Sequence, residues 1–285
     1  MQNVVLVTDT IACLTRGQIE EYGIAIIPMR INYDGHEYRE FVDITASEAY
    51  QLLEKNPERF VTSPPSPGEL LQTFRELGQR AKGIACITVS SKLSAQYSIA
   101  RLAAEQVQQE LPDVTITVLD SMNVATAQGL IVLAAARTAA RGGSILEVAQ
   151  TIEGIKPRIR ILMVLETIRH VYRSGRVPKV AARVGAALGV KPILTVSDGV
   201  VRFVGAARNK HSGISRIMDT MKEETGQRTL HVAVMHAEAR DEAQRLMETI
   251  SSEFTCAELW LSEFSPIMGY ATGRGLIGIA YYSEG

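Results

Sequence analysis

The chain has 285 residues, and its 30 basic and 31 acidic side chains nearly cancel. This balance excludes a general electrostatic attraction to nucleic acid or to an anionic membrane. The length is sufficient for two domains that each bury a core. Three widely spaced cysteines form no disulfide or metal pattern, and no signal-peptide pattern opens the sequence. The most apolar segment, residues 129–136, is too short to span a bilayer, so we expect a soluble, cytoplasmic protein.

Short apolar runs alternate with amphipathic segments in the first half of the chain. This alternation predicts parallel strands joined by right-handed helical crossovers, and hence an α/β/α domain over residues 1–157. The expected strands are residues 4–7, 24–31, 84–89 and 114–119, and the expected helices are residues 15–22, 45–55, 67–81, 93–109, 124–140 and 144–155.

Residues 62–69 are typical of a hydroxyl-bearing loop that runs into the start of a helix. Ser66 suits the N-cap position, and Glu69 completes a capping box with it. Thr62 and Ser63 then remain without a local structural task. A rigid loop at a helix N-terminus with spare hydroxyls can hold an anion or a carboxylate. The same pattern also fits a capped helix with two solvated hydroxyls.

Polar residues also follow other strands of the first half, at residues 8–10, 90–94 and 120–121. The carboxyl ends of parallel strands meet at one edge of an open α/β sheet, where ligands bind. The segment 90–94 is expected to begin a helix, so it would add backbone N–H groups to its hydroxyls. The alternative is that Ser91 or Ser94 only caps this helix.

The second half mixes a hairpin with helices, which predicts a smaller α/β domain with a mixed sheet over residues 158–285. Residues 190–196 and 200–206 form the hairpin, because an Asp-Gly turn lies between them. The other expected strands are residues 161–165, 230–235, 256–261 and 276–282, and the expected helices are residues 166–172, 209–224 and 241–251.

The order and spacing of several motifs closely resemble those of the DegV family of fatty-acid-binding proteins. The matching segments are residues 8–14, 62–69, 90–94, 119–121, 173–176, 190–194 and 273–275. The resemblance implies a parallel α/β/α first domain, a smaller α/β second domain, and a long acyl chain buried between them.

The resemblance also implies that Thr62 and Ser94 hydrogen-bond the fatty-acid carboxylate, with Ser63, Ser91 and Ser121 close by. A carboxylate needs such donors. The acyl chain needs an apolar tunnel, although each candidate lining residue, taken singly, fits an ordinary core position better. These candidates are Leu93, Leu130, Ile131, Ile161, Met163, Leu165 and Met268.

Two positions depart from the family pattern near the C-terminus. Ala271 stands where the family usually carries a histidine close to the ligand head group, and Arg274 stands where it usually carries a proline. One implied head-group contact is therefore missing. Our hypothesis is that Arg274, or Arg202 from the hairpin, supplies the positive partner instead.

Some DegV-like proteins resemble the acyl-carrying subunit of bacterial fatty-acid kinase, whose separate kinase subunit phosphorylates the bound fatty acid for phospholipid synthesis. This chain has no Gly-rich phosphate loop, so phosphoryl transfer would come from a partner. Arg173, Arg176 and Lys179 are candidates for docking that partner, or else form a solvated basic surface. We expect a non-catalytic lipid-binding protein without metal or cofactor, with transient membrane contact as a further possibility.

Three other functions compete with this interpretation. A lipid carrier without any kinase would use the same pocket. A serine hydrolase or acyltransferase would use Ser94 or Ser63 with help from Asp9 or Asp120, but no histidine lies in these loops and Gly-x-Ser-x-Gly is absent. A dinucleotide-binding enzyme would need Gly-x-Gly-x-x-Gly after the first strand, where residues 8–12 lack it.

Overall fold

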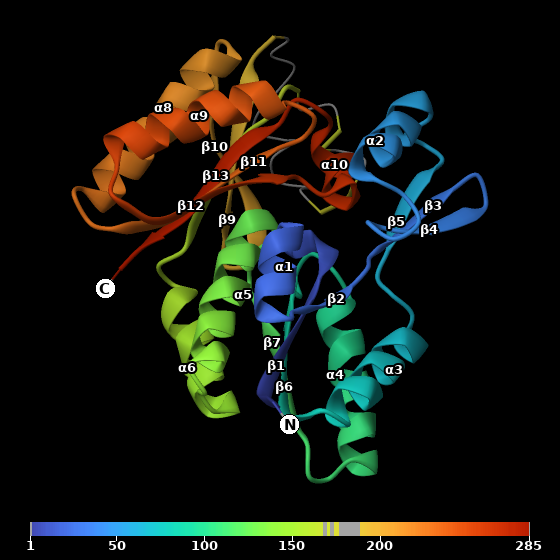
Figure 1. Cartoon of the computed structure of the whole chain (residues 1–285). Helices are drawn as coiled ribbons and strands as arrows, with labels where there is room; N and C mark the ends of the chain where they lie inside the picture. The colour runs from blue at the N-terminus through green and yellow to red at the C-terminus, as the bar shows by residue number, and fades with distance from the viewer. Residues whose placement is uncertain (1, 168–169, 172–173, 177–188, 285) are drawn as a thin grey trace.

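The computed structural model describes residues 2–284 except 168–169, 172–173 and 177–188. The described residues form a four-stranded sheet, a six-stranded sheet and a small three-stranded sheet. The two larger sheets lie one above the other in Figure 1, and the small sheet stands to one side with α2 (Ala46–Lys55). The expected helical turn at residues 166–172 falls partly outside the described residues, and Arg173 and Lys179 fall wholly outside them.

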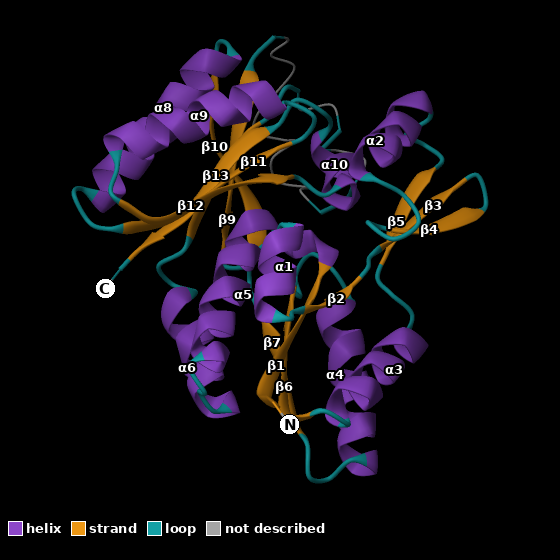
Figure 2. Ribbon diagram, viewed as in Figure 1, coloured by secondary structure: helices purple, strands orange, loops and turns teal. Residues whose placement is uncertain are grey.

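The four-stranded sheet is parallel throughout, in the order β2-β1-β6-β7, as the alternating pattern predicted. Helices pack on both of its faces (Figure 2), because its strands bury apolar side chains on both sides. Its strands are β1 (Gln2–Asp9), β2 (Ala25–Ile27), β6 (Ala81–Thr88) and β7 (Thr115–Asp120). The helices are α3 (Pro67–Gly78) and α4 (Gln96–Glu110) on one face, and α5 (Ala125–Ala140) and α6 (Ile145–Ile155) on the other.

The six-stranded sheet is mixed, in the order β10-β9-β8-β13-β11-β12, which also agrees with the sequence pattern. Only β11 and β12 pair in parallel. The strands are β8 (Arg160–Val164), β9 (Lys191–Ser197), β10 (Val200–Ala207), β11 (Leu230–His236), β12 (Cys256–Glu263) and β13 (Ile277–Ser283). Helices α8 (Lys210–Thr225) and α9 (Arg240–Glu253) cover one face of this sheet through a core of their own.

The small sheet corrects the sequence interpretation of residues 24–63. The single strand expected at 24–31 is divided into β2 and β3 (Arg30–Tyr33), and Pro28 and Met29 lie outside both strands. The hairpin of β3 with β4 (His36–Arg39) was not predicted, and Thr62 and Ser63 lie in β5 (Phe60–Ser63) rather than in a loop.

Helix α5 joins the two larger sheets into one core. Every residue from Ala125 to Ala136 is buried, so the helix has no solvated face in that stretch. One hydrophobic cluster contains residues of α5, of the parallel sheet and of the mixed sheet. The boundary predicted at residues 157 and 158 falls just before β8 and remains a prediction. Among the described residues, no helix is both long and apolar enough to cross a membrane.

Candidate functional site

A cavity of about 120 Å³ lies between the parallel sheet and the mixed sheet, and both halves of the chain line it. This volume is several times what one water molecule needs. Most of the lining is apolar. The polar side chains that line it are Thr62, Ser63, Ser94, Ser174, Arg176 and Thr272, while the apolar ones include Ile11, Met29, Val89, Met163, Leu194, Phe264 and Met268. Such a surface suits an apolar ligand that carries a polar group.

Strand β5 brings Thr62 and Ser63 to the cavity. Thr62 pairs with Ile31 of β3, so its backbone is fixed by the small sheet. The chain then enters α3 through the predicted capping box: Ser66 Oγ accepts from Glu69 N at 3.4 Å, and Ser66 N donates to Glu69 Oε2 at 3.0 Å. The two hydroxyls are therefore held between a paired strand and a capped helix.

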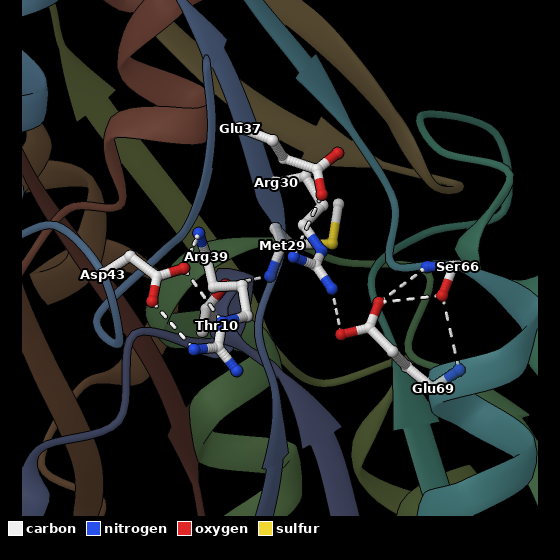
Figure 3. Close-up of polar contacts among 8 residues, drawn as sticks. All are labelled: Thr10, Met29, Arg30, Glu37, Arg39, Asp43, Ser66 and Glu69. Carbon is white, nitrogen blue, oxygen red and sulfur yellow. Dashed lines mark hydrogen bonds and ion pairs between the residues drawn. The ribbon is translucent and has the colours of Figure 1, made fainter.

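Arginine side chains brace this region, as Figure 3 shows. Arg30 of β3 forms ion pairs with Glu69 of α3 and with Glu37 of β4, the latter at 3.2 Å, and so ties the small sheet to α3. Arg39 binds both carboxylate oxygens of Asp43 at 2.8 and 2.9 Å, which lowers the pKa of Asp43 to about 2. The Arg30 pairs thus hold the small sheet, which carries Thr62 on β5, against α3.

Ser94 lies in a turn rather than in the helix that the sequence predicted from residue 93. Ser94 N donates to Ser90 O at 3.1 Å, and α4 begins only at Gln96. Ser94 Oγ accepts from Gln96 N at 3.2 Å. Since this bond uses a lone pair, the hydroxyl proton stays available for a carboxylate.

Residues of the second half of the chain form hydrogen bonds with the same turn. Ser90 Oγ donates to Gly199 O at 2.7 Å, and Lys92 Nζ donates to Asp198 O at 2.8 Å. Both acceptors lie in the turn between β9 and β10. Arg176 Nε donates to Leu93 O at 3.4 Å, so a guanidinium stands beside Ser94.

Buried carboxylates lie behind the cavity wall. Asp9 accepts from Val89 N at 2.9 Å, Ile11 N at 3.2 Å and Gln128 Nε2 at 3.0 Å. Burial raises the pKa of Asp9 to about 6 against these three donors. Because Val89 and Ile11 line the cavity, Asp9 fixes two wall segments.

Glu40 is buried behind another part of the wall, and burial raises its pKa to about 7. Ser265 donates its hydroxyl to this carboxylate and also caps α10 (Pro266–Thr272) through Ile267 N at 3.2 Å. Helix α10 supplies Ile267 and Met268 to the cavity. Glu40 therefore anchors the start of a wall helix.

The structure brings together only part of the predicted head-group set. Thr62, Ser63 and Ser94 line one cavity. Ser91 is exposed, and Ser121 is buried with its hydroxyl donating to Asn123 O at 3.1 Å, so neither lines it. The roles assigned to these residues remain predictions.

The two arginines chosen as positive partners also lie outside the cavity lining. Arg274 forms ion pairs with Glu54 and Glu238, and Arg202 pairs with Asp198 at 3.1 Å. Arg176 lines the cavity instead, although the sequence suggested it only for partner docking.

The predicted tunnel residues divide in the same way. Leu93, Met163 and Met268 line the cavity. The others are buried in the shared core outside the lining; these are Leu130, Ile131, Ile161 and Leu165.

Sequence reasoning named Met268 but predicted neither the helix α10 around it nor the residue before its cap as parts of the cavity wall. Phe264, Ile267 and Tyr270 line the cavity, and Tyr270 stacks on Phe60 of β5 with ring centroids 6.2 Å apart. The Ser-Pro pair at residues 265–266 is a helix-start signal that could have located α10.

The described residues form neither a serine hydrolase site around this cavity nor a metal site. Asp120 accepts from Ser91 N at 3.2 Å and from Met122 N at 2.8 Å, which gives it a structural task. No histidine belongs to the described lining of the cavity, so no base stands beside Ser94 or Ser63 there. Among the described residues, no group of three or more histidine, cysteine or acidic residues is arranged to hold a metal ion.

This is an α/β protein in which a parallel sheet and a mixed sheet enclose a mainly apolar cavity with hydroxyl groups in its wall. A family model described as an uncharacterised protein of the DegV family matches residues 3–284. The chain belongs to the DegV family.

Curated relatives and solved structures agree with this assignment. The chain is 30% identical over 284 residues to a DegV domain-containing protein of Caldanaerobacter subterraneus, covering 99% of each chain. It is 29% identical to protein DegV of Bacillus subtilis, covering 98% of this chain and 99% of that one.

The crystal structure of Bacillus subtilis DegV, described as a fatty acid binding protein, matches with a TM-score of 0.90 at 28% identity over the whole of both chains. A Thermus thermophilus DegV family structure, described by its fatty acid binding, matches with a TM-score of 0.91 at 25% identity, covering 99% of this chain and all of that one. The fold is therefore that of the DegV proteins.

Proposed function

We propose that this protein binds a long-chain fatty acid, with the carboxylate at the hydroxyl-bearing end of the cavity and the acyl chain along its apolar wall. The observation that carries the proposal is the grouping of Thr62, Ser63, Ser94 and Arg176 in an otherwise mainly apolar lining. Fatty acid binding in the similar proteins of Bacillus subtilis and Thermus thermophilus supports it.

The carboxylate is held by the hydroxyls of Thr62 and Ser94, with Ser63 beside them. Hydrogen bonds to an ionised acceptor are about twice as strong as neutral ones, so two hydroxyl donors give a firm hold. Arg176 supplies the positive charge that we first assigned to Arg274 or Arg202, since it alone of the three lines the cavity. Its described hydrogen bonds go to backbone carbonyls, which leave its charge available.

The acyl chain lies against Met163, Leu194, Val201, Phe264 and Met268. Burial of each methylene is worth about 0.8 kcal/mol, so the tail supplies most of the affinity and the head group supplies orientation. This arrangement needs no catalytic residue, and we propose that the protein itself is not an enzyme.

We further propose that the protein presents its fatty acid to a separate kinase subunit, which forms an acyl phosphate for phospholipid synthesis. The chain lacks a Gly-rich phosphate loop, so the nucleotide must be bound elsewhere. Arg173 and Lys179 remain the predicted docking residues for that subunit. A lipid carrier without a kinase is the second candidate, because the same cavity serves it.

The test is solvent extraction of the purified protein followed by mass spectrometry of the released lipid. We expect about one equivalent of a long-chain fatty acid, since both halves of the chain line this one cavity. The Thr62→Ala/Ser94→Ala variant should lose it, whereas Ser91→Ala, which changes an exposed serine outside the lining, should keep it. A protein that is empty and ignores added fatty acid would overturn the proposal.

A further inference from the structure

A groove of about 800 Å³ lies apart from the cavity that Thr62 and Ser94 line, and the two share no lining residue. Helices α6 and α8 and strands β8, β9 and β10 contribute to its lining, with α8 at the upper left and α6 at the lower left of Figure 1. Its apolar lining residues include Leu162, Ile193, Val196 and Ile217. Since small-molecule sites typically enclose about 300–1,000 Å³, the groove has room for such a ligand.

The charged residues of this lining are paired with one exception. Each acidic residue of the lining has a cationic partner, and the ion pairs are Glu153 with Lys156 at 2.9 Å, Asp198 with Arg202 at 3.1 Å, and Glu224 with Arg160 at 3.6 Å. Of the charged residues in the described lining, only Arg216 of α8 has no ion pair. The groove therefore carries one positive charge that no carboxylate neutralises, and this charge complements an anion.

The guanidinium of Arg216 lies against a glycine of the neighbouring strand β10. A Cβ atom at Gly205 would lie 2.7 Å from Arg216 Nη1 and 2.9 Å from both Cζ and Nη2. These nearly equal distances show that the face of the guanidinium, rather than its edge, lies over the backbone of β10. Because the N–H groups of a guanidinium point outward in its plane, this arrangement leaves them available for an anion.

We propose that this groove is a second ligand site and that it takes an amphipathic anion, which is a molecule with one acidic group on an apolar body. The acidic group binds the N–H edge of Arg216, whose fork matches two oxygens of a carboxylate or a phosphate. The apolar body lies over Leu162, Ile193 and Val196. Because the groove and the cavity share no lining residue, this proposal does not depend on the proposed function.

Calorimetric titrations with octyl phosphate and octanoate test this site, with octanol as the neutral ligand of the same chain length. The two anions together show which acidic group the groove prefers. We expect Arg216→Gln, which removes the charge, to bind the preferred anion roughly tenfold more weakly and octanol unchanged, because the charge-assisted hydrogen bonds are lost. Gly205→Ala should also weaken anion binding, since the added methyl group would displace the guanidinium.

Arg245→Gln, at an exposed position of α9 outside the groove, is the matched control and should change none of these affinities. Thr62→Ala/Ser94→Ala alters only the other cavity and should keep anion binding in the groove. Equal anion affinity in the wild type and Arg216→Gln, or loss of binding in Thr62→Ala/Ser94→Ala alone, would overturn the inference. A wild-type protein that binds neither anion would also overturn it. Thermal melting of each variant separates loss of fold from loss of affinity.

Discussion

The two sides of the cavity are built from different chemistry. The first half contributes Thr62, Ser63 and Ser94 on a strand and a turn that are fixed by local hydrogen bonds. The second half contributes most of the apolar wall, through β8, β9, β10 and α10. In the proposed function, polar recognition thus rests on the small sheet and on the turn after β6, with Arg176 added from the second half, while the mixed sheet and a short helix supply most of the apolar surface.

The apolar side is tested most strongly by Phe264→Ala. This side chain is almost fully buried and lines the cavity, so we expect a loss of about 3–5 kcal/mol in the free energy of unfolding. Chemical denaturation measures it. Phe74→Ala removes an equally buried ring outside the cavity and should destabilise similarly without changing fatty-acid affinity. If both variants bound fatty acid equally well, the wall assignment would be wrong.

The pH dependence of stability tests the contact between Glu40 of the first half and Ser265 of the second half. Burial raises the pKa of Glu40 from 4.5 to about 7, so the folded chain binds this proton more tightly than the unfolded chain does. Stability should therefore fall as the pH rises from about 4.5 to about 7, by on the order of 3 kcal/mol from this group. Glu40→Gln should flatten that part of the profile of unfolding free energy against pH; an unchanged slope would contradict this assignment.

The charge at the junction of the two sides is tested by Arg176→Ala. Loss of one cation beside the carboxylate should weaken fatty-acid binding roughly tenfold. Arg202→Ala is the matched control, because Arg202 is exposed, pairs with Asp198 and does not line the cavity. A larger loss in Arg202→Ala than in Arg176→Ala would restore the hypothesis drawn from the sequence.

The smallest effect is expected on the polar side, from Ser66→Ala. Loss of the N-cap of α3 should lower the unfolding free energy by about 1 kcal/mol. Ser98→Ala, at an exposed position of α4, should have almost no effect in the same denaturation experiment. If the two variants were equally stable, the capping box would not contribute to holding the Thr62 strand.

The fold was predicted mainly from local sequence patterns. Alternation of apolar runs predicted the parallel sheet, the hairpin mixed with helices predicted the mixed sheet, and the capping box at Ser66 was confirmed. The hairpin of β3 and β4 was missed although its Asp34-Gly35 turn was visible, with φ angles of 53° and 81°. Its outer positions are charged, so the strands do not form apolar runs.

Contacts between distant segments limited the prediction of the site. Sequence reasoning named Thr62, Ser63 and Ser94 of the lining hydroxyls, although it placed Thr62 and Ser63 in a loop rather than at the end of β5. That Arg176 reaches Leu93 depends on how the halves pack, and no local pattern records it. Likewise, Leu130 of α5 is apolar in the same way as Met163, yet only Met163 lines the cavity.

One contact couples residue choices in the two halves of the chain. The Tyr50 ring of α2 packs on the backbone of Gly269 in α10, and its hydroxyl donates to Phe264 O at 2.9 Å. Any side chain larger than hydrogen at position 269 would collide with that ring. A chimaera of two relatives joined near residue 157 must therefore inherit a compatible pair at positions 50 and 269, which couples the cavity wall at α10 to a helix from the opposite half.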